Sequence, residues 1–128
     1  MNKQIIHTDK APSAVGPYSQ AVSCCPNKIV FLSGQIGLNP NTGKLEEKSF
    51  DLQVRQAFKN MLCVIEASEA SIENIVKTTI YLTDLSKFEI VNSIMADLFL
   101  KPFPARTTVE VSSLPKGAQF EIEVILSL

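Results

Sequence analysis

Apolar residues recur along this chain at two different spacings, and the spacing changes from one segment to the next. Over residues 50–70 they recur every three or four positions, which places them on one face of a helix. No Gly or Pro interrupts this stretch. It therefore predicts an amphipathic helix whose buried face carries Val54, Phe58, Met61, Leu62 and Ile65.

A second helix is predicted to begin near Ser86. This serine lies three residues before Glu89, the spacing of a capping box, in which each side chain bonds a free backbone N–H of the other residue. Pro102 and Pro104 would end the helix, because a proline ring removes a hydrogen-bond donor and clashes with the preceding turn. The predicted buried face carries Phe88, Val91, Met95, Leu98 and Phe99.

Segments rich in β-branched and aromatic residues predict strands over 28–32, 76–82, 106–112 and 119–126, with a shorter strand near 18–23. Residues 39–43 (NPNTG) predict a turn. In the last strand Glu121 and Glu123 alternate with apolar residues and should share one face. In the strand over 76–82, one side is expected to carry Val76, Thr78, Ile80 and Leu82.

The order of these elements indicates an α+β fold in which two helices pack on one face of a sheet. The length of 128 residues suits a single domain over residues 1–128. The second face of a small, partly apolar sheet is usually covered by another copy or lined with polar groups. We therefore expect a homo-oligomer.

Charge and composition exclude several classes of function. The net charge is −1, from 12 basic and 13 acidic residues, and no basic cluster is present, which argues against general nucleic-acid or membrane-surface binding. The first ten residues contain no apolar signal-peptide core, and no apolar run is long enough to cross a bilayer. Together with three cysteines (Cys24, Cys25 and Cys63) expected to be reduced, this predicts a cytoplasmic protein.

The residue types available for chemistry are few. His7 is the single histidine and no Cys-x-x-Cys occurs, so a zinc site is not expected. The same shortage excludes Ser-His-Asp and Cys-His catalysis unless His7 is the base. We expect no metal and no cofactor, and chemistry carried by Arg, Glu, Tyr, Ser, backbone groups and water.

Arg106 follows a proline-rich loop, which would hold its guanidinium at a defined point for two parallel hydrogen bonds to a carboxylate. The alternative is an exposed arginine in a loose ion pair. Glu121 and Glu123 on one strand face could hold a water or transfer a proton, or could simply be the solvated face of an edge strand.

Three further positions are candidates for a binding role. Tyr18 follows a Gly-Pro turn, and Gly34 after Ser33 would let a ligand approach the backbone closely. Both could equally be turn residues. Asn92 lies within the second helix, where an asparagine is a mediocre helix former and could be buried or exposed.

An ordered set of short motifs resembles the Rid/YjgF family, and most closely its RidA subgroup. The set extends over almost the whole chain, and its order is specific although each fragment alone is weak. Its members are 16–21 (GPYSQA), 33–36 (SGQI), 39–40 (NP), 42–43 (TG), Gln53, Gln56, Asn60, 75–79 (IVKTT), 91–92 (VN), 104–106 (PAR), 109–111 (VEV), 114–115 (LP) and 121–123 (EIE).

The resemblance implies a chorismate-mutase-like fold, a homotrimer with a ligand cleft at each interface, and activity as a 2-iminobutanoate/2-iminopropanoate deaminase-type hydrolase. Family members convert enamines and imines such as 2-aminoacrylate to 2-keto acids and ammonia. By the same resemblance, Arg106 would hold the substrate carboxylate and Glu121 would position the attacking water. The other implied cleft residues are Tyr18, Ser33, Gly34, Asn92 and Thr107.

The chain departs from the family pattern between Asn92 and Arg106, where it is about three residues shorter than typical members. The residues after Asn92 also lack the usual aromatic side chain, which could change the substrate range. Three alternative functions remain at this point. One is an endoribonuclease or translation inhibitor, which the near-zero net charge disfavours. Another is a non-catalytic sensor of 2-keto acids, which would use the same Arg106, and the third is a chaperone-like role.

Overall fold

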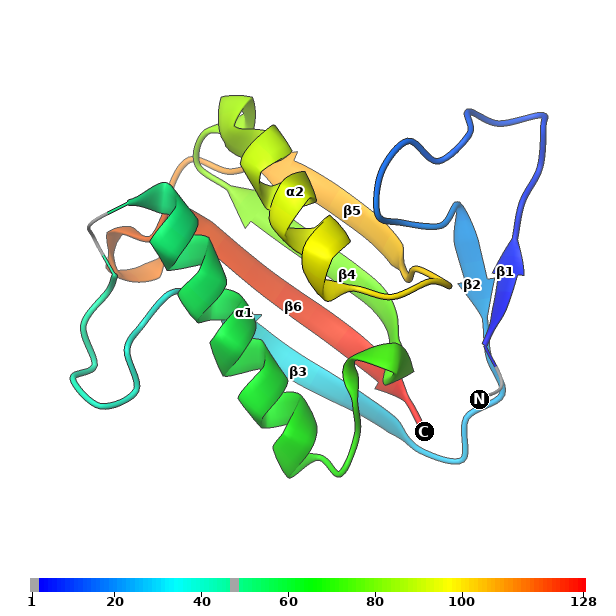
Figure 1. The fold of residues 1–128 in the computed structure, drawn as a ribbon, viewed down its shortest axis with the longest axis horizontal. Coiled ribbons are helices and arrows are strands. Elements are labelled where there is room, and N and C mark those ends of the chain that lie inside the picture. Colours follow the sequence, from blue (N-terminus) through cyan, green and yellow to red (C-terminus); the bar gives the residue numbers. More distant parts are fainter. Residues whose placement is uncertain (1–2, 47–48) are drawn as a thin grey trace.

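The computed structural model describes residues 3–46 and 49–128. A four-stranded mixed sheet has the order β3-β6-β4-β5, in which β4 and β5 are parallel and the other neighbours are antiparallel. A separate two-stranded sheet pairs β1 with β2 (Figure 1). The strands are β1 (Gln4–Ile6), β2 (Ala21–Ser23), β3 (Ile29–Gln35), β4 (Ile75–Leu82), β5 (Ala105–Glu110) and β6 (Phe120–Ser127).

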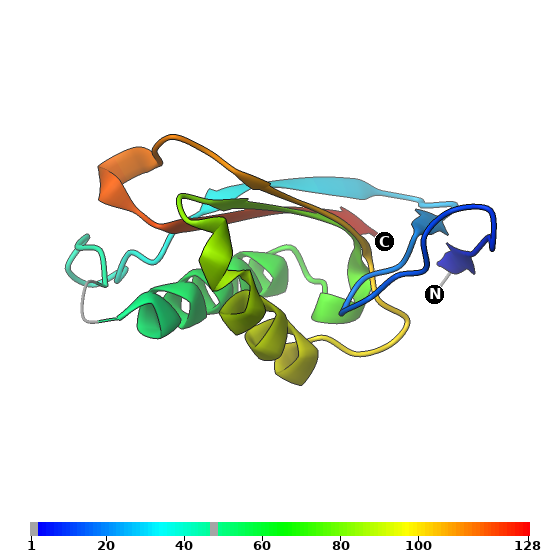
Figure 2. The same cartoon turned by 90° about the horizontal axis from the view of Figure 1, so that it is seen from above.

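Both long helices, α1 (Phe50–Ala67) and α2 (Phe88–Leu98), lie on the same face of the four-stranded sheet (Figure 2). The core fills the space between this face and the helices. Phe58 of α1 packs against Phe120 of β6 and Phe99 after α2, with ring centroids 5.5 and 6.1 Å apart. The predicted α+β arrangement of two helices on one sheet face is confirmed.

The predicted helix over residues 50–70 is three residues too long. Ser49 caps the start of α1 through a side chain that accepts a hydrogen bond from the Leu52 N–H. At the other end, Glu69 adopts a positive φ of 58°, and the Ala70 N–H bonds the Ile65 carbonyl oxygen. A residue in this left-handed conformation ends a helix by closing its last carbonyl groups.

The predicted capping box of Ser86 and Glu89 is wrong. Asp84 takes this role, because its side chain accepts hydrogen bonds from the Ser86 N–H and hydroxyl at 3.0 and 2.6 Å. A short 3-10 turn, η2 (Leu85–Lys87), then leads into α2. An ionised carboxylate is the stronger acceptor for a free N–H at a helix start, and it holds the serine away from Glu89.

The strand predicted over 76–82 has one misplaced residue. A register shift between Ile75 and Lys77 puts Ile75, rather than Val76, on the buried side with Thr78, Ile80 and Leu82. In β6, by contrast, the predicted alternation is confirmed, with Phe120, Ile122 and Val124 buried and the two glutamates partly exposed. The short strand β1 was not predicted.

The face of the sheet opposite the helices, here called the open face, carries exposed apolar side chains. Phe31 is 74% exposed and Ile29 is 50% exposed, whereas their neighbour Leu32 points into the core at 5%. Val109 of the edge strand β5 adds a third exposed apolar residue. An apolar surface of this kind is typical of an interface.

Candidate functional site

Arg106 lies at the start of β5 with its guanidinium between two aromatic rings. The guanidinium carbon is 4.8 Å from the centroid of the Tyr18 ring and 5.0 Å from that of Phe88. One guanidinium nitrogen donates to Asn92 Oδ1 at 2.7 Å and also lies 3.6 Å from the sulfur of Met95. Both rings lie within cation–π distance of the guanidinium, and the bond to Asn92 holds one of its nitrogens in place.

The charge of Arg106 is not neutralised by the described part of the chain. The ion pairs found among residues 3–46 and 49–128 join His7 to Asp9 and Arg55 to Asp51. Burial lowers the pKa of the Arg106 guanidinium, but an arginine stays protonated at physiological pH. A half-buried cation with aromatic faces and free N–H donors favours binding of a small anion, above all a carboxylate.

The Tyr18 loop is attached to the segment just before β5 through the side chain and the backbone of Ser19. The Ser19 hydroxyl donates to the Phe103 carbonyl oxygen at 2.6 Å, and the Ser19 N–H donates to that of Pro104 at 2.9 Å. Gly16 turns the chain with a φ of 137°. A Cβ at Gly16 would lie 3.5 Å from an Arg106 guanidinium nitrogen, so the loop backbone packs directly against the cation.

Glu121 lies on the open face, where it covers Gly34. A Cβ added to Gly34 would overlap the Glu121 carboxylate, so the glycine makes room for it. Burial first, and then the nearby charge of Glu123, raise the pKa of the Glu121 carboxyl. Glu123 in turn accepts a hydrogen bond of 2.7 Å from the Tyr81 hydroxyl.

Arg106 and Glu121 lie on opposite faces of the sheet of one chain. Arg106 pairs with Thr78 of β4, which is fully buried beneath the helices, whereas Glu121 pairs with Tyr81 on the other side. Because successive side chains of a strand point to opposite faces, positions three apart on β4 cannot share a face. A single chain therefore does not form the one cleft expected for both residues.

The predicted site residues thus fall into separate groups. Arg106, Tyr18 and Asn92 are brought together at the helix-facing edge of the sheet. Gly34 and Glu121 meet on the open face, next to the exposed Ser33. Thr107 points to the open face of β5, where its hydroxyl accepts a hydrogen bond from the Lys77 ammonium at 2.9 Å.

Two contacts of Arg106, Phe88 and Met95, were predicted only as core residues. Phe88, Asn92 and Met95 follow one another at i, i+4 and i+7 along α2 and therefore share one helix face. A polar Asn between two apolar residues on that face was a signal of a partly buried polar contact. The Asn92 side chain is in fact half-buried against the cation.

Three family-matching polar residues of α1 have structural roles. Gln53 is 2% exposed and both ends of its amide are bonded, to the Glu46 carbonyl oxygen and the Gln119 N–H. Asn60 donates to the carbonyl oxygens of Ile36 and Leu38 and accepts from Gln56. These bonds attach the loop after β3 and the start of β6 to the helix, and so hold the Gly34 region in place.

Neither a metal-binding cluster nor a membrane-spanning helix occurs in the described part of the chain. Within 3–46 and 49–128, no three His, Cys, Asp or Glu side chains gather as a metal site. Over the same ranges no helix is long and apolar enough to cross a membrane. Cys24, Cys25 and Cys63 are free thiols, as predicted.

Comparison with known proteins gives a consistent set of relatives. A family model described as endoribonuclease L-PSP matches residues 8–127. A chloroplastic Reactive Intermediate Deaminase A of Arabidopsis thaliana is 48% identical over 128 residues, covering all of this chain and 67% of that protein. A human 2-iminobutanoate/2-iminopropanoate deaminase is 42% identical over 123 residues, or 96% of this chain and 88% of that protein.

Solved structures agree with these sequence relatives. The Rid-family protein YyfA of Yersinia pestis superposes with a TM-score of 0.77 at 50% identity, over 98% of this chain and 99% of that one. The YjgF protein of E. coli superposes with a TM-score of 0.73 at 38% identity, over 97% and 98%.

Proposed function

Because this chain belongs to the endoribonuclease L-PSP family, which is the Rid/YjgF family, we propose that it is a hydrolase that deaminates small enamines and imines of the 2-aminoacrylate type. Relatives that carry the name 2-iminobutanoate/2-iminopropanoate deaminase at 40–44% identity support the imine substrate class. The observation that carries the proposal is Arg106, a half-buried and rigidly held cation with no carboxylate partner in the described chain.

In this proposal the substrate carboxylate binds the free N–H edge of Arg106, and the electrophilic carbon is thereby positioned. A water held by Glu121 adds its oxygen to the carbon of the protonated imine, and one water proton passes to the carboxylate, which gives a neutral carbinolamine. Glu121 returns this proton to the amino nitrogen, the C–N bond breaks, and the hydroxyl proton passes to the departing ammonia as the C=O bond of a 2-keto acid forms. An enamine first takes a proton at carbon to become the imine. These compounds hydrolyse unaided, so orientation supplies most of the needed acceleration, and no metal or cofactor takes part.

The opposite placement of Arg106 and Glu121 leads us to propose that the cleft forms between copies of the chain. Residues 1–128 act as one domain with a chorismate-mutase-like fold, and three copies assemble through their open faces. The β5 edge of one copy, with Arg106 and Thr107, then meets Gly34 and Glu121 of the next. The apolar residues exposed on the open face support this arrangement. A cytoplasmic location stays a prediction, and one relative is named as chloroplastic.

Activity is tested by generating the imine or enamine with a serine or threonine dehydratase and measuring its loss with and without the purified protein. Faster loss supports the deaminase. Saturable binding of a 2-keto acid without turnover would instead indicate the non-catalytic sensor. RNA cleavage with steep salt dependence would indicate the endoribonuclease.

Replacing Phe31 by Glu is expected to weaken the assembly, because the open face would then bury a charge at each interface. Sedimentation should show a trimer for the native protein and smaller species for Phe31→Glu, with a loss of deaminase activity. Leu52→Glu is the matched control, since Leu52 is 43% exposed on α1, away from the open face. A native protein that sediments as a monomer would contradict the shared cleft.

Replacing Glu123 by Gln is expected to extend deaminase activity to lower pH. Glu121 must be ionised to take a proton from water, and the neighbouring charge of Glu123 is the second cause of its raised pKa, after burial. Removing that charge lowers the pKa of Glu121, so the acid limb of kcat against pH moves down in pH. Glu66→Gln on α1 makes the same charge change far from the site and should leave the limb in place.

The same raised pKa has a consequence for stability. Between its unfolded and folded pKa values, Glu121 binds more protons in the folded protein than in the unfolded chain. Its contribution therefore makes the free energy of unfolding fall as pH rises through this window. The fall of the free energy of unfolding with pH should be less steep in Glu123→Gln. In Glu121→Gln the contribution of residue 121 to this fall should be absent. If Glu123→Gln changed neither the acid limb of kcat against pH nor the slope of the free energy of unfolding against pH, the two carboxylates would not be coupled.

A further inference from the structure

A long loop, residues 7–20, connects β1 to β2 and carries Tyr18 onto the Arg106 guanidinium (Figure 1). Ordered connections of this length are uncommon in compact domains and usually serve a function. Residues 7–13 are all exposed, and Val15 is 79% exposed. The loop contains no helix or strand, so its shape depends on the bonds that individual residues make.

Ser19 fixes the backbone next to Tyr18. Its hydroxyl and its N–H donate to two carbonyl oxygens of the segment 103–104, and the residue forms an isolated parallel bridge with Ala105. Ser19 is 9% exposed, so water has little access to these bonds. Because Arg106 directly follows Ala105, the loop is attached to β5 next to the residue that carries the cation.

Gln20 fixes the first half of the loop through both ends of its side-chain amide. Its Oε1 accepts a bond of 2.7 Å from the Thr8 N–H. Its Nε2 donates to the carbonyl oxygens of Thr8 and Pro12 at 3.1 and 2.7 Å, with a longer contact of 3.4 Å to that of Ala11. One amide with two N–H donors and an acceptor oxygen therefore joins residues 8–12 to the start of β2.

The far end of the Tyr18 ring is held by the part of the loop that Gln20 fixes. The Tyr18 hydroxyl accepts a bond of 3.3 Å from the Val15 N–H. Val15 follows the segment 8–12 by three residues, so the position of its N–H depends on that segment. The ring is thus held near its backbone by Ser19 and at its hydroxyl through the loop that Gln20 organises.

We infer that Ser19 and Gln20 are positioning residues of the Arg106 site, which hold the Tyr18 ring against the guanidinium before a ligand arrives. A cation that is already held in place binds a carboxylate more tightly, because less order must be imposed on binding. The carboxylate contact is the same in the substrate and in the transition state, so loosening the ring should raise KM and leave kcat nearly unchanged. This kinetic consequence rests on the proposed function, whereas the placement of the ring does not.

The placement of the ring is tested by NMR of the guanidinium Nε–H groups in the isotope-labelled full chain. Arg55 and Arg106 are the two arginines of the sequence, so two such signals are expected. Aromatic ring currents should shift the Arg106 signal away from that of the exposed Arg55. Tyr18→Leu defines the position of the Arg106 signal without the tyrosine ring. Gln20→Ala and Ser19→Ala should each move the Arg106 signal toward that position and leave the Arg55 signal in place.

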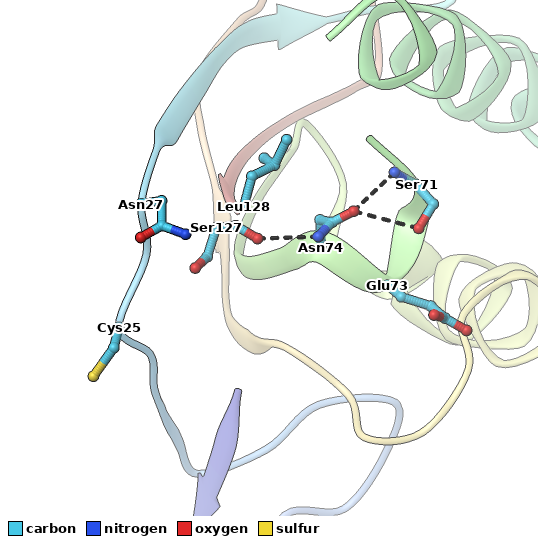
Figure 3. Close-up of a pocket in the computed structure, with 7 residues that line it drawn as sticks. All are labelled: Cys25, Asn27, Ser71, Glu73, Asn74, Ser127 and Leu128. Carbon is cyan, nitrogen blue, oxygen red and sulfur yellow. Dashed lines mark hydrogen bonds between the residues drawn. The ribbon is translucent and has the colours of Figure 1, made fainter. Parts of the chain in front are cut away.

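Two further variants make this result specific to the amide of Gln20. Gln20→Glu keeps the size and an acceptor oxygen but loses the N–H donors, so it should move the signal at least as far as Gln20→Ala. Asn74→Ala is the matched control. The Asn74 amide also joins two segments, because it accepts from the Ser71 N–H beside the 3-10 turn η1 (Ile72–Asn74) and donates to the Ser127 carbonyl oxygen (Figure 3). Its loss should leave both arginine signals in place.

The kinetic consequence is measured in the dehydratase-coupled assay. Gln20→Ala and Ser19→Ala should each raise KM about two- to tenfold, the range for the loss of one hydrogen bond, with little change in kcat. The Kd of pyruvate should rise by a similar factor, because pyruvate presents the same carboxylate. Asn74→Ala should leave KM and the pyruvate Kd at their native values, and circular dichroism should show a native fold in every variant.

Failure of this inference can be told apart from failure of the proposed function. An Arg106 signal that does not move in Gln20→Ala and Ser19→Ala would overturn the inference, whether or not the native protein hydrolyses imines. A moved signal with KM and pyruvate binding at the native level would also overturn it, since the ring placement would not matter for binding. In a native protein without deaminase activity, a moved signal and a raised pyruvate Kd would support the positioning roles, and the proposed reaction alone would be wrong.

Discussion

Arg106→Ala is expected to lower kcat/KM for imine hydrolysis by about 30-fold to several-thousand-fold. Truncating one partner of a buried, hydrogen-bonded charge pair costs about 2–5 kcal/mol, and each 1.4 kcal/mol is about a factor of ten. The substrate carboxylate would lose its cation while the aromatic faces of Tyr18 and Phe88 remain. The measurement is the dehydratase-coupled assay, with substrate generated in situ.

Two further variants make the result specific to the guanidinium. Arg55→Ala is the matched control, because Arg55 is exposed and paired with Asp51 at 2.8 Å, and it should keep full activity. Arg106→Lys retains the charge but loses the flat fork, so only partial activity is expected. Circular dichroism and sedimentation should show that Arg106→Ala keeps its fold and assembly. Activity at the native level in Arg106→Ala would show that Arg106 does not hold the substrate carboxylate.

Phe120→Ala is expected to lower the free energy of unfolding by about 3–5 kcal/mol, the range for truncating a buried aromatic residue. Phe120 has no exposed surface and its ring packs against Phe58 of α1 at the junction of sheet and helix. The alanine would leave a cavity that α1 cannot close, because Gln53 on the same helix is fixed by bonds to Glu46 and Gln119. Urea unfolding monitored by circular dichroism measures the loss.

Phe120→Leu is the matched control and should cost far less, because it retains most of the buried volume. All proteins must be compared at one concentration, since association of copies adds to the apparent stability. A loss below about 1 kcal/mol in Phe120→Ala would mean that the helix–sheet core repacks around the gap, contrary to the dense packing expected of a protein interior.

Much of the secondary structure was predictable, because the relevant signal is local. The stripe of apolar residues in α1 and the alternation in β6 follow directly from the geometry of a helix and a strand. The errors are the missed short strand β1, element ends and irregularities. Asp84 displaced the predicted cap at Ser86, and the register shift near Val76 depends on how β4 pairs with β6. Neither the choice of Asp84 as the capping residue nor the register shift can be predicted from residue spacing alone.

The candidate site was predictable as a set of residues but not as an arrangement. The stiff loop before Arg106 and the family motifs marked Arg106, Tyr18 and Asn92, which do meet in space. Phe88 was assigned to the core because an aromatic residue on a helix stripe usually packs inside. Its stacking on a cation depends on the approach of α2 to the start of β5, which is a contact between segments far apart in the chain.

The sequence by itself determined the α+β class, the helices and strands, the family and the residues capable of chemistry, because each depends on local periodicity or on ordered motifs. Only the tertiary structure decided that Arg106 and Glu121 lie on opposite faces of one sheet. The two residues are on strands separated by β4, and their relative facing depends on the registers of β5 and β6 against it. Register is set by long-range pairing and burial, so no local pattern contains it.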